Sequence, residues 1–423
     1  MKGSSPSTVA VIGSGISGIT AAYLLQKRFK VTLLEKDARI GGHTNTIVIP
    51  EGPDKGTPVD TGFIVLNDKT YPNLHRLLAA WGVEVRFSDM SFGFHCRDSG
   101  LQYSGRGLNG LFAQRMNMLS LRHLRLIREI ILFCRGALAE QELGNNLHNL
   151  TLAEYLKKCG FSDVLAQDYL VPMGSAIWSA IPDGMLSFPA ATFISFFKNH
   201  GLLSLKERPR WQTIVGGSHQ YLRAFEKSFS GEIKHGAEVL GVSRRNGKVE
   251  VTLASGEAHT FDQVVLAVHA DQVLSILKDS TPLEQRIFTK WRYQKNTAFL
   301  HTDISVLPPN RRAWASWNYL RERGSREILC VTYDMNRLQG LQTACHYLVT
   351  LNAAGLLDDR KIIREIEYHH PVYDSAAAAT QQELSAQQGE HGTWFCGSYC
   401  GYGFHEDGAR SAVQVAEKLG CAL

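Results

Sequence analysis

The stretch Val9-Ala10-Val11-Ile12-Gly13-Ser14-Gly15-Ile16-Ser17-Gly18 decides the fold of this chain. Val9–Ile12 is apolar and rich in β-branched residues, which predicts a buried parallel strand. Three glycines follow at the spacing G-x-G-x-x-G, and Ile16 to about Phe29 is predicted to be a helix. The first glycine permits a tight turn, the second lets a pyrophosphate approach the backbone, and the third lets the helix pack against the strand. The N-terminus of that helix offers free N–H groups to phosphate.

A second strand and an acid complete this pattern. Val31–Leu34 is apolar, and Glu35 follows it at the spacing where a carboxylate accepts hydrogen bonds from ribose hydroxyls. A glycine motif alone would be a weak signal. Because the strand before it, the helix after it and the acid all agree, we interpret the region as a dinucleotide-binding unit rather than a coincidental glycine loop.

Two elements after Glu35 indicate which dinucleotide is bound. Arg39-Ile40-Gly41-Gly42-His43-Thr44 lies just past the acid, and Asp60-Thr61-Gly62-Phe63 follows. This pattern resembles the amine-oxidase and phytoene-desaturase superfamily of FAD enzymes, and the resemblance implies FAD as the cofactor. Many members carry arginine where this chain has His43, so Arg39 is the alternative source of positive charge for the FAD phosphates.

The C-terminal end of the chain continues the resemblance. Thr393–Ser398 is predicted to be a strand that ends in a glycine turn, Gly401–Ala409 a glycine-rich loop, and Arg410 to about Leu419 a helix. In the superfamily this helix points its N-terminus at the flavin ring, where its dipole stabilises negative charge. The family usually has Gly-Asp where this chain has Gly397-Ser398, and a hydroxyl can still bond a ribityl or phosphate oxygen.

The middle of the chain supplies a third matching block. Trp211–Ser218 resembles the family's Gly-Gly turn before a helix, and Phe261–Val268 resembles a strand that returns to the nucleotide domain. Ala237–Leu253 is predicted to form two strands around the turn Asn246-Gly247. The resemblance implies that the backbone at Val239 meets the adenine.

The residues predicted to contact FAD therefore come from three separated parts of the chain. They are Gly13, Gly15, Ile16, Ser17, Gly18, Glu35, Lys36, Arg39, Gly41, Gly42, His43, Thr44, Thr61, Gly62, Phe63, Val239, Gly397, Ser398, Glu406, Asp407, Gly408 and Ala409.

The predicted fold class is α/β, with a Rossmann-like FAD-binding domain of the glutathione-reductase or amine-oxidase type interleaved with an α+β substrate domain. A chain of 423 residues suits two such domains. We assign residues 1–70, 206–270 and 391–423 to the FAD-binding domain and residues 71–205 and 271–390 to the substrate domain. In the latter, Trp314–Tyr319, Thr297–His301 and Glu327–Tyr333 are predicted strands, and Ala376–Gln388 a helix or loop.

Composition limits the partners and the compartment. The net charge of +5 gives no argument for nucleic acid, and the eight cysteines show no CxxC pair or other metal-ligand spacing, so no metal site is predicted. Cysteines without an ordered framework indicate reduced thiols. No signal peptide or spanning apolar run is visible. The expected location is the cytoplasm, with peripheral contact to a membrane face left open.

Two stretches of the substrate domain leave alternatives open. Asn117–Leu138 is a predicted helix with arginines against the single acid Glu129, which suits either a membrane interface or a solvated face of an ordinary helix. A solvated face of an ordinary helix is the commoner of these two arrangements. Leu186–Leu203 is aromatic and almost uncharged, and it fills either the core or the wall of an apolar pocket.

A closer resemblance concerns the substrate. His301–Asp303, Ala313–Tyr319, Val331–Gln339 and Gly401–Gly408 look like a subgroup of predicted FAD oxidoreductases associated with cyclopropane-fatty-acid synthases. That subgroup implies a lipid or fatty acyl substrate, and desaturation of a methyl-branched fatty acyl chain is an activity within it.

The preferred hypothesis is an FAD-dependent oxidoreductase that desaturates a lipid acyl chain by hydride transfer to flavin N5, with oxygen or a quinone as the acceptor. Such chemistry needs a C–H bond held close to the flavin in a dry pocket and few other protein groups. His405, Lys295 and His301 are the candidates for proton handling, with His405 first because it lies in the loop expected beside the flavin.

Two alternatives remain. One is an amine oxidase with a soluble amine as substrate, for which Tyr399, Tyr402 and Phe404 are aromatic candidates. The other is a non-redox FAD-containing protein that acts as the partner of a lipid methyltransferase.

Overall fold

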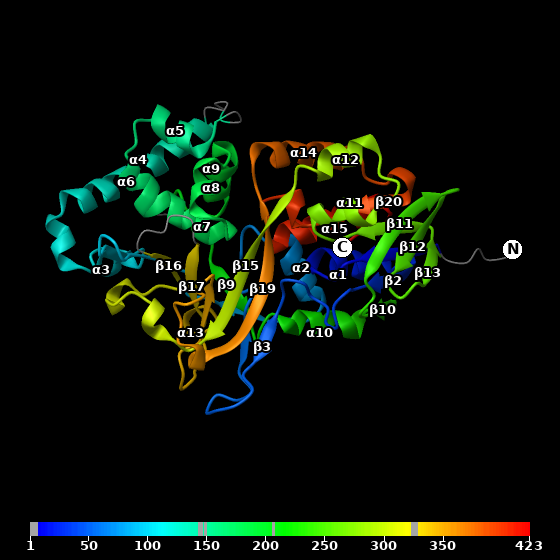
Figure 1. The fold of residues 1–423 in the computed structure, drawn as a ribbon, viewed down its shortest axis with the longest axis horizontal. Helices are drawn as coiled ribbons and strands as arrows, with labels where there is room; N and C mark the ends of the chain where they lie inside the picture. Colours follow the sequence, from blue (N-terminus) through cyan, green and yellow to red (C-terminus); the bar gives the residue numbers. More distant parts are fainter. Residues whose placement is uncertain (1–6, 143–146, 148–149, 205–207, 323–328) are drawn as a thin grey trace.

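The computed structural model describes residues 7–142, 147, 150–204, 208–322 and 329–423 (Figure 1). Two large β-sheets organise the fold. One carries the predicted nucleotide-binding turn, and the other belongs to a half with several packed helices on it. The predicted α/β fold class is confirmed.

The first sheet has five parallel strands in the order β10-β2-β1-β14-β20. They are β1 (Thr8–Ile12), β2 (Lys30–Leu34), β10 (Glu232–Lys234), β14 (Gln263–Leu266) and β20 (Thr393–Phe395). Parallel strands present their carboxyl ends at one edge, so three distant parts of the chain meet there. The sheet thus brings together the stretches that sequence patterns linked to FAD.

Alternate residues of β1 face two different layers. Val9 and Val11 belong to the core that holds α1 (Ile16–Leu25) and α15 (His405–Lys418). Ala10 and Ile12 belong to the core that includes the antiparallel sheet of β11 (Val239–Arg245), β12 (Lys248–Leu253) and β13 (Ala258–Phe261). This alternation buries both faces of the sheet and explains why its strands are continuously apolar.

Several predicted boundaries differ in the structure, among them that of the strand predicted at Trp314–Tyr319, which is Trp317–Arg321. The C-terminal helix begins at His405 rather than Arg410, because the Asp407 carboxylate accepts a hydrogen bond from the Phe404 backbone N–H and caps the helix early. Helix α1 ends at Leu25, four residues before the predicted end. The predicted turn at Asn246-Gly247 is confirmed, with positive φ at both residues.

The second sheet is mixed and has seven strands in the order β19-β15-β18-β17-β16-β7-β8. They are β7 (Phe92–Cys96), β8 (Gln102–Ser104), β15 (Arg292–His301), β16 (Trp317–Arg321), β17 (Cys330–Asp334), β18 (Leu348–Leu351) and β19 (Ile362–Val372). The long strands β15 and β19 run between the two halves of the molecule (Figure 1). Residues 327 and 328 of one predicted strand lie outside the described residues.

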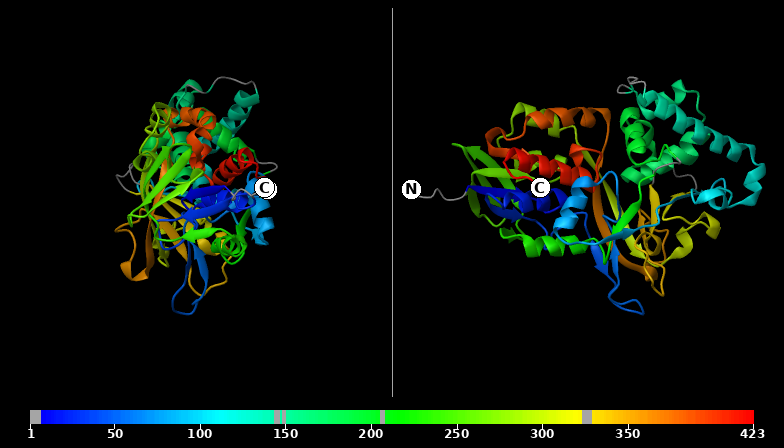
Figure 2. Two further views of the ribbon diagram at one scale, coloured as in Figure 1. Left: turned by 90° about the vertical axis from the view of Figure 1, so that its right-hand side faces the viewer. Right: turned by 180° about the vertical axis from the view of Figure 1, so that it is seen from behind.

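Helices cover this sheet at one end of the molecule (Figure 2). They are α3 (Gly107–Leu111), η1 (Arg115–Leu119), α4 (Leu121–Glu142), α5 (Leu152–Lys158), α6 (Asp163–Leu165), η2 (Ala166–Leu170), α7 (Val171–Trp178), α8 (Pro182–Leu186) and α9 (Ala190–Asn199). The predicted helix 117–138 is thus a short 3₁₀ turn followed by α4. The aromatic residues of α9 are largely buried, with Phe193 and Phe197 fully enclosed, so this stretch fills the core.

The remaining elements are shorter. They are α2 (Pro72–Ala80), β3 (Thr46–Val48), β4 (Pro58–Asp60), β5 (Leu66–Asn67), β6 (Val85–Phe87), β9 (Trp211–Ile214), α10 (His219–Ser228), η3 (Ala270–Gln272), α11 (Val273–Ile276), α12 (Pro282–Phe288), η4 (Ile304–Val306), η5 (Arg311–Ala313), α13 (Met335–Leu338), η6 (Asp359–Lys361), α14 (Ser375–Ala386), η7 (Glu390–Gly392) and η8 (Ser398–Cys400). Helix α2 falls in the predicted substrate domain, yet Leu74 and Leu77 pack in the core of α1 and α15. No helix among the described residues is long and apolar enough to cross a bilayer.

Gly18 tests how tightly α1 sits on the strand. A Cβ there would lie 1.8 Å from the Gly13 carbonyl oxygen, so Gly18→Ala should lower the free energy of unfolding by about 1–3 kcal/mol. Gly136→Ala in α4 is the matched control, because a Cβ there meets no atom within 4 Å and should slightly stabilise the helix. Urea unfolding measures both, and equal effects would contradict the packing argument.

Candidate active site

The glycine turn between β1 and α1 has the shape that an anion site requires. Gly13 adopts a φ of +95°, and a Cβ there would lie 2.7 Å from the Ala267 carbonyl oxygen. A Cβ at Gly15 would meet no atom within 4 Å, so the space in front of that residue is open. Gly15 is the N-cap of α1, and this helix has neither a side-chain cap nor an acid in its first turn. Its backbone N–H groups are therefore available to a phosphate.

Glu35 lies at the carboxyl end of β2 beside this turn. Its Oε2 accepts a hydrogen bond from the Ser14 backbone N–H at 2.9 Å and a second, short one from the Ser14 hydroxyl. Its Oε1 accepts from the Asp37 N–H at 3.0 Å, while its carbonyl accepts from the Ala237 N–H at 2.8 Å. The last contact brings the chain leading to Val239 next to the acid. Lys36, the following predicted contact, is exposed.

The loop that contains Gly41 and Gly42 packs directly on the glycine turn. The Gly41 N–H donates to the Ser14 carbonyl at 3.0 Å, and a Cβ on Gly42 would lie 3.2 Å from Gly15 Cα. The Arg39 guanidinium donates to the carbonyls of Gly42 at 2.8 Å and Thr44 at 3.0 Å. Arg39 makes no ion pair with a described carboxylate, so its charge remains to favour an anion at this turn.

Three predicted cofactor stretches meet around His405. The Phe63 N–H donates to the His43 carbonyl at 2.9 Å, and a Cβ on Gly62 would lie 1.9 Å from that same oxygen. The Phe63 ring stacks on the His405 ring with centroids 3.7 Å apart. His405 Nε2 lies 3.0 Å from the Thr44 hydroxyl. Residues near positions 43, 62 and 405 thus form one contiguous surface beside the glycine turn, which we call the wall of the site.

A cluster of aromatic rings continues this wall. The His43 ring lies 5.1 Å from Tyr368, 5.2 Å from His370 and 5.8 Å from His269. Burial lowers the pKa of His43 to about 4, of His269 to about 3 and of His405 to about 3, and it also lowers the pKa of His370. These imidazoles are therefore neutral at physiological pH. His43 Nε2 is buried and has no hydrogen-bond partner among the described residues, which leaves a polar atom for a ligand.

The C-terminal glycine loop reaches the same site from β20. Among the described residues the Ser398 hydroxyl has no hydrogen-bond partner, so it is available to a ligand. Gly397 is extended, and its N–H donates to the Ser411 hydroxyl at 3.0 Å. A Cβ at this position would lie 2.3 Å from the Tyr399 ring. A Cβ on Gly408 would lie 2.7 Å from the Ser17 hydroxyl, so α15 crosses α1 closely at that point. Ile16 packs at the same crossing, and Ala409 is fully buried.

Both acids in the first turn of α15 are engaged by the protein. The Glu406 carboxylate accepts hydrogen bonds from the Asn73 N–H at 3.1 Å and the Leu74 N–H at 3.0 Å, which caps α2. The Asp407 carboxylate accepts from Phe404 and from the Arg410 guanidinium at 2.6 Å. Their side chains therefore support the loop, and α15 offers its backbone N–H groups to the site.

The buried Asp60 carboxylate, next to Thr61 and Gly62, is hydrogen-bonded to residues from three other parts of the chain. It accepts hydrogen bonds from Ser218 at 2.8 Å, from Thr46 at 2.5 Å and from the Gln339 amide at 3.1 Å. Burial raises its pKa to about 6, while the bonds from Thr46 and Ser218 oppose that rise. Thr61, the next residue, bonds the Tyr368 hydroxyl at 2.9 Å.

The three residues predicted to handle protons lie in different places. Lys295 is exposed and forms an ion pair with Glu367. His301 is fully buried in the seven-stranded sheet, where its Nε2 lies 2.7 Å from the Thr350 hydroxyl and its Nδ1 accepts from the Asp303 N–H. Only His405 lies with the predicted cofactor residues.

Sequence patterns missed several members of the site. Tyr368 and His370 come from β19, Tyr221 comes from α10 and bonds the Thr44 hydroxyl, and His269 follows β14. His269 directly follows the strand expected at Phe261–Val268, and that position was one available signal. A second signal was the pair of histidines at 369 and 370 in a strand-like segment. None of the four residues lies in a glycine motif.

The aromatic candidates of the C-terminal loop point to different neighbours. Tyr399 is buried against Phe288 and Trp291. Tyr402 and Phe404 both contact Phe196 of α9, with centroids 5.8 and 4.9 Å apart. The loop before His405 therefore abuts an apolar layer. Among the described residues, no group of three or more acidic, histidine or cysteine side chains is placed to hold a metal ion.

The family model described as flavin containing amine oxidoreductase matches residues 16–369. An L-amino-acid oxidase of Vipera ammodytes ammodytes is 22% identical over 71% of this chain and 62% of its own length. Polyamine oxidase 3 of Oryza sativa subsp. japonica is 26% identical over 69% of this chain and 56% of its own length. The chain thus spans less than two thirds of these relatives.

Solved structures share the fold across nearly the whole chain. A CLA-producing fatty acid isomerase from P. acnes has a TM-score of 0.70 and 18% identity, and the match covers 97% of this chain and 98% of that one.

Gly15 tests the anion site without disturbing the fold. Gly15→Ala should leave stability unchanged, since its φ is −64° and the added Cβ meets no protein atom, but it should occupy space reserved for the pyrophosphate. We expect purified Gly15→Ala to carry markedly less flavin than wild type, measured by visible absorbance against protein concentration. Gly136→Ala is the control, and full flavin content in Gly15→Ala would contradict the assignment.

The neutral histidines predict how stability depends on pH. Folding lowers the pKa of His405 to about 3, so the unfolded chain binds the proton first and stability falls as pH drops below about 6.5. At pH 5 one such histidine costs about 2 kcal/mol. His405→Gln should reduce the loss between pH 7.5 and 5 by up to about that amount in urea unfolding. The control His235→Gln, at an exposed position, should lose as much stability between pH 7.5 and 5 as the wild type. If the free energy of unfolding falls with pH equally in His405→Gln and wild type, the assignment to His405 is wrong.

Proposed function

The chain belongs to the flavin containing amine oxidoreductase family, and from this premise we propose that it is an FAD-dependent oxidoreductase that dehydrogenates a lipid acyl chain. The chemistry that FAD supplies when bound is two-electron oxidation of a C–H bond.

The residues at the edge of the parallel sheet fit FAD. The turn at Gly13 and Gly15 would bind the pyrophosphate with the uncapped N-terminus of α1, and Glu35 would accept hydrogen bonds from the ribose. The Ser398 hydroxyl and His43 Nε2 are polar atoms left for the flavin side. The positive charge of Arg39 favours the phosphates.

The residues around His405 favour an apolar substrate over a charged one. The nearby imidazoles are neutral, and Phe404 joins the site to the aromatic layer at Phe196. The carboxylates of this loop, Glu406 and Asp407, are already hydrogen-bonded within the protein. A cationic amine would therefore find no unengaged carboxylate in this loop, whereas an acyl chain needs only an apolar, dry wall.

His405 acts in this proposal as a positioning residue. A general base works best with a pKa near the working pH, and burial holds the pKa of His405 at about 3. Its imidazole stays neutral, bonds the Thr44 hydroxyl and stacks on Phe63. In this way it fixes the wall against which cofactor and substrate would lie.

The motif resemblance to FAD proteins associated with cyclopropane-fatty-acid synthases supports a lipid substrate. The fold does not decide the matter, because a fatty acid isomerase and a putrescine oxidase both share it. Oxidation of an amine is the second candidate, favoured by the amino-acid and polyamine oxidases among the relatives.

An anaerobic reduction assay separates these functions. Purified flavoprotein is mixed without oxygen with a total lipid extract, with free fatty acids or with a panel of amines, and the visible flavin absorbance is followed. We expect lipids or fatty acyl compounds to bleach the flavin and amines to leave it unchanged. Bleaching by amines alone would favour the amine oxidase. A flavin that nothing bleaches would favour the non-redox role beside a lipid methyltransferase.

A further inference from the structure

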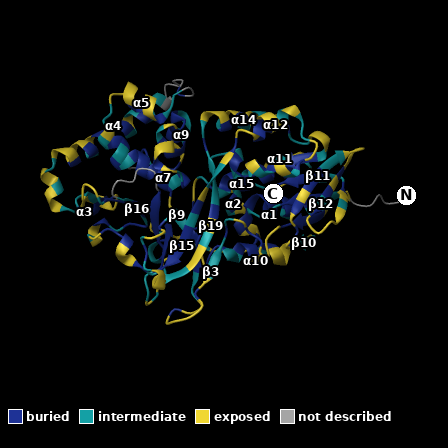
Figure 3. Ribbon diagram, in the orientation of Figure 1, coloured by how far each residue is buried: buried dark blue, intermediate teal, exposed yellow. Residues whose placement is uncertain are grey.

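An exposed apolar surface lies at the end of the molecule formed by α3, η1 and α4. Leu119 is 79% exposed and Leu121 is 85% exposed, although both are large aliphatic side chains. We call this surface the α3–α4 face. Its apolar members are Leu108, Met116, Met118, Leu119, Leu121, Leu124, Ile131 and Leu132. Figure 3 shows these helices as the exposed left-hand end of the molecule, and so large a group of exposed apolar side chains marks an interaction site.

The same face is positively charged. Residues 106–135 contain six arginines and one acid, Glu129. That acid is buried, where it accepts hydrogen bonds from Arg125 at 2.9 Å and from the Ser162 hydroxyl at 2.6 Å. Arg128 and Arg135 are exposed and form no ion pair with a described residue. The exposed part of the face is thus apolar and cationic.

Apolar and basic side chains share the outer side of α4. Leu121, Leu124 and Ile131 are exposed there together with Arg128 and Arg135. The inner side of the helix is supplied by Leu126, Phe133 and Ala137, which are buried. An ordinary surface helix buries its apolar stripe and exposes a polar one. Helix α4 has a complete buried stripe and carries further large apolar residues outside it.

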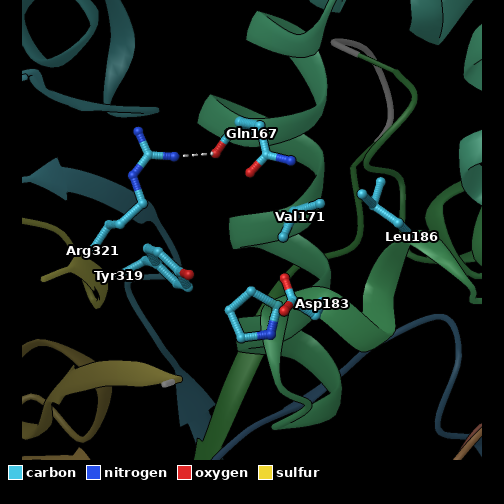
Figure 4. A pocket seen from close by; sticks show the side chains of 7 residues that line it. Gln167, Val171, Asp183, Leu186, Tyr319 and Arg321 are labelled. Atoms are coloured by element: carbon cyan, nitrogen blue, oxygen red, sulfur yellow. Dashed lines mark hydrogen bonds between the residues drawn. The ribbon is translucent and has the colours of Figure 1, made fainter. Parts of the chain in front are cut away.

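This face is fixed firmly to the substrate half of the molecule. The buried Asp168 carboxylate, in the π-helical turn η2, accepts from Arg122 of α4 at 2.7 Å and from Arg321 of β16 at 2.8 Å. Arg321 also lines a hollow with Gln167 and Tyr319 (Figure 4). The ion-pair network therefore connects the face to the sheet of the substrate half.

We propose that the α3–α4 face docks the protein on an anionic lipid bilayer. The exposed leucines and methionines would insert at the boundary between the lipid headgroups and the acyl chains. The arginines would bind the phosphates of anionic lipids. A second copy of this chain fits less well, because a symmetric contact would place like charges opposite one another. Docking on a bilayer does not depend on the proposed function. If the proposed function also holds, the bilayer is the source of the acyl substrate.

Vesicle sedimentation with the holoprotein tests this proposal. We expect binding to vesicles of phosphatidylcholine with phosphatidylglycerol to be at least about tenfold stronger than to phosphatidylcholine alone. The double variant Leu119→Asp with Arg128→Glu should lose at least about tenfold of that binding. The control Leu240→Asp with Arg245→Glu, which makes the same changes at exposed positions of β11, should bind like wild type. Flavin content should be equal in all three.

The outcomes distinguish docking from catalysis. If the protein ignores anionic vesicles, or if the control loses as much binding as the face variant, the docking proposal is wrong even when acyl compounds bleach the flavin. If vesicles bind but no acyl compound bleaches the flavin, docking stands and the proposed function fails. If light scattering shows that the wild type self-associates and the face variant does not, the face serves a second copy and the bilayer proposal is overturned.

Discussion

The close crossing of α1 and α15 is the constraint on which the site depends. A Cβ on Gly408 would lie 2.7 Å from the Ser17 hydroxyl, so the two helices can approach only because that position has no side chain. Because Ser17 and Gly408 lie in the first turns of α1 and α15, this approach brings the N-termini of the two helices close together. Two helix N-termini there favour a large anionic ligand.

Glycine motifs correctly predicted the turn between β1 and α1, because each glycine there has a local reason. Gly13 needs its positive φ, and Gly18 needs to lie against the Gly13 carbonyl. Side-chain partners were harder, since they depend on residues far away in the chain. The Glu406 carboxylate, for example, caps α2 through Asn73, which is 333 positions away in the chain. Tyr368 and His370 reach the site through the register of β15 and β19, which no local pattern specifies.

Helix α4 likewise has features that the sequence shows and others that depend on packing with distant residues. Its arginines and apolar residues were apparent in the sequence, but the sequence could not decide which of them faced inward. In the structure Leu126 and Phe133 fill the core, and Leu121 and Ile131 are left outside. The two ends of the molecule then have different properties: a parallel sheet that fits FAD, and a basic apolar face that we propose docks on a bilayer, with the seven-stranded sheet between them (Figure 1).

Hydrogen exchange of the protein depleted of flavin and then supplied with FAD tests the central claim most directly. The account predicts that FAD slows amide exchange together in four segments: 13–18, 35–44, 61–63 and 397–409. Protection confined to the first glycine turn, or protection by NAD of the same size, would contradict a single site built from both ends of the chain.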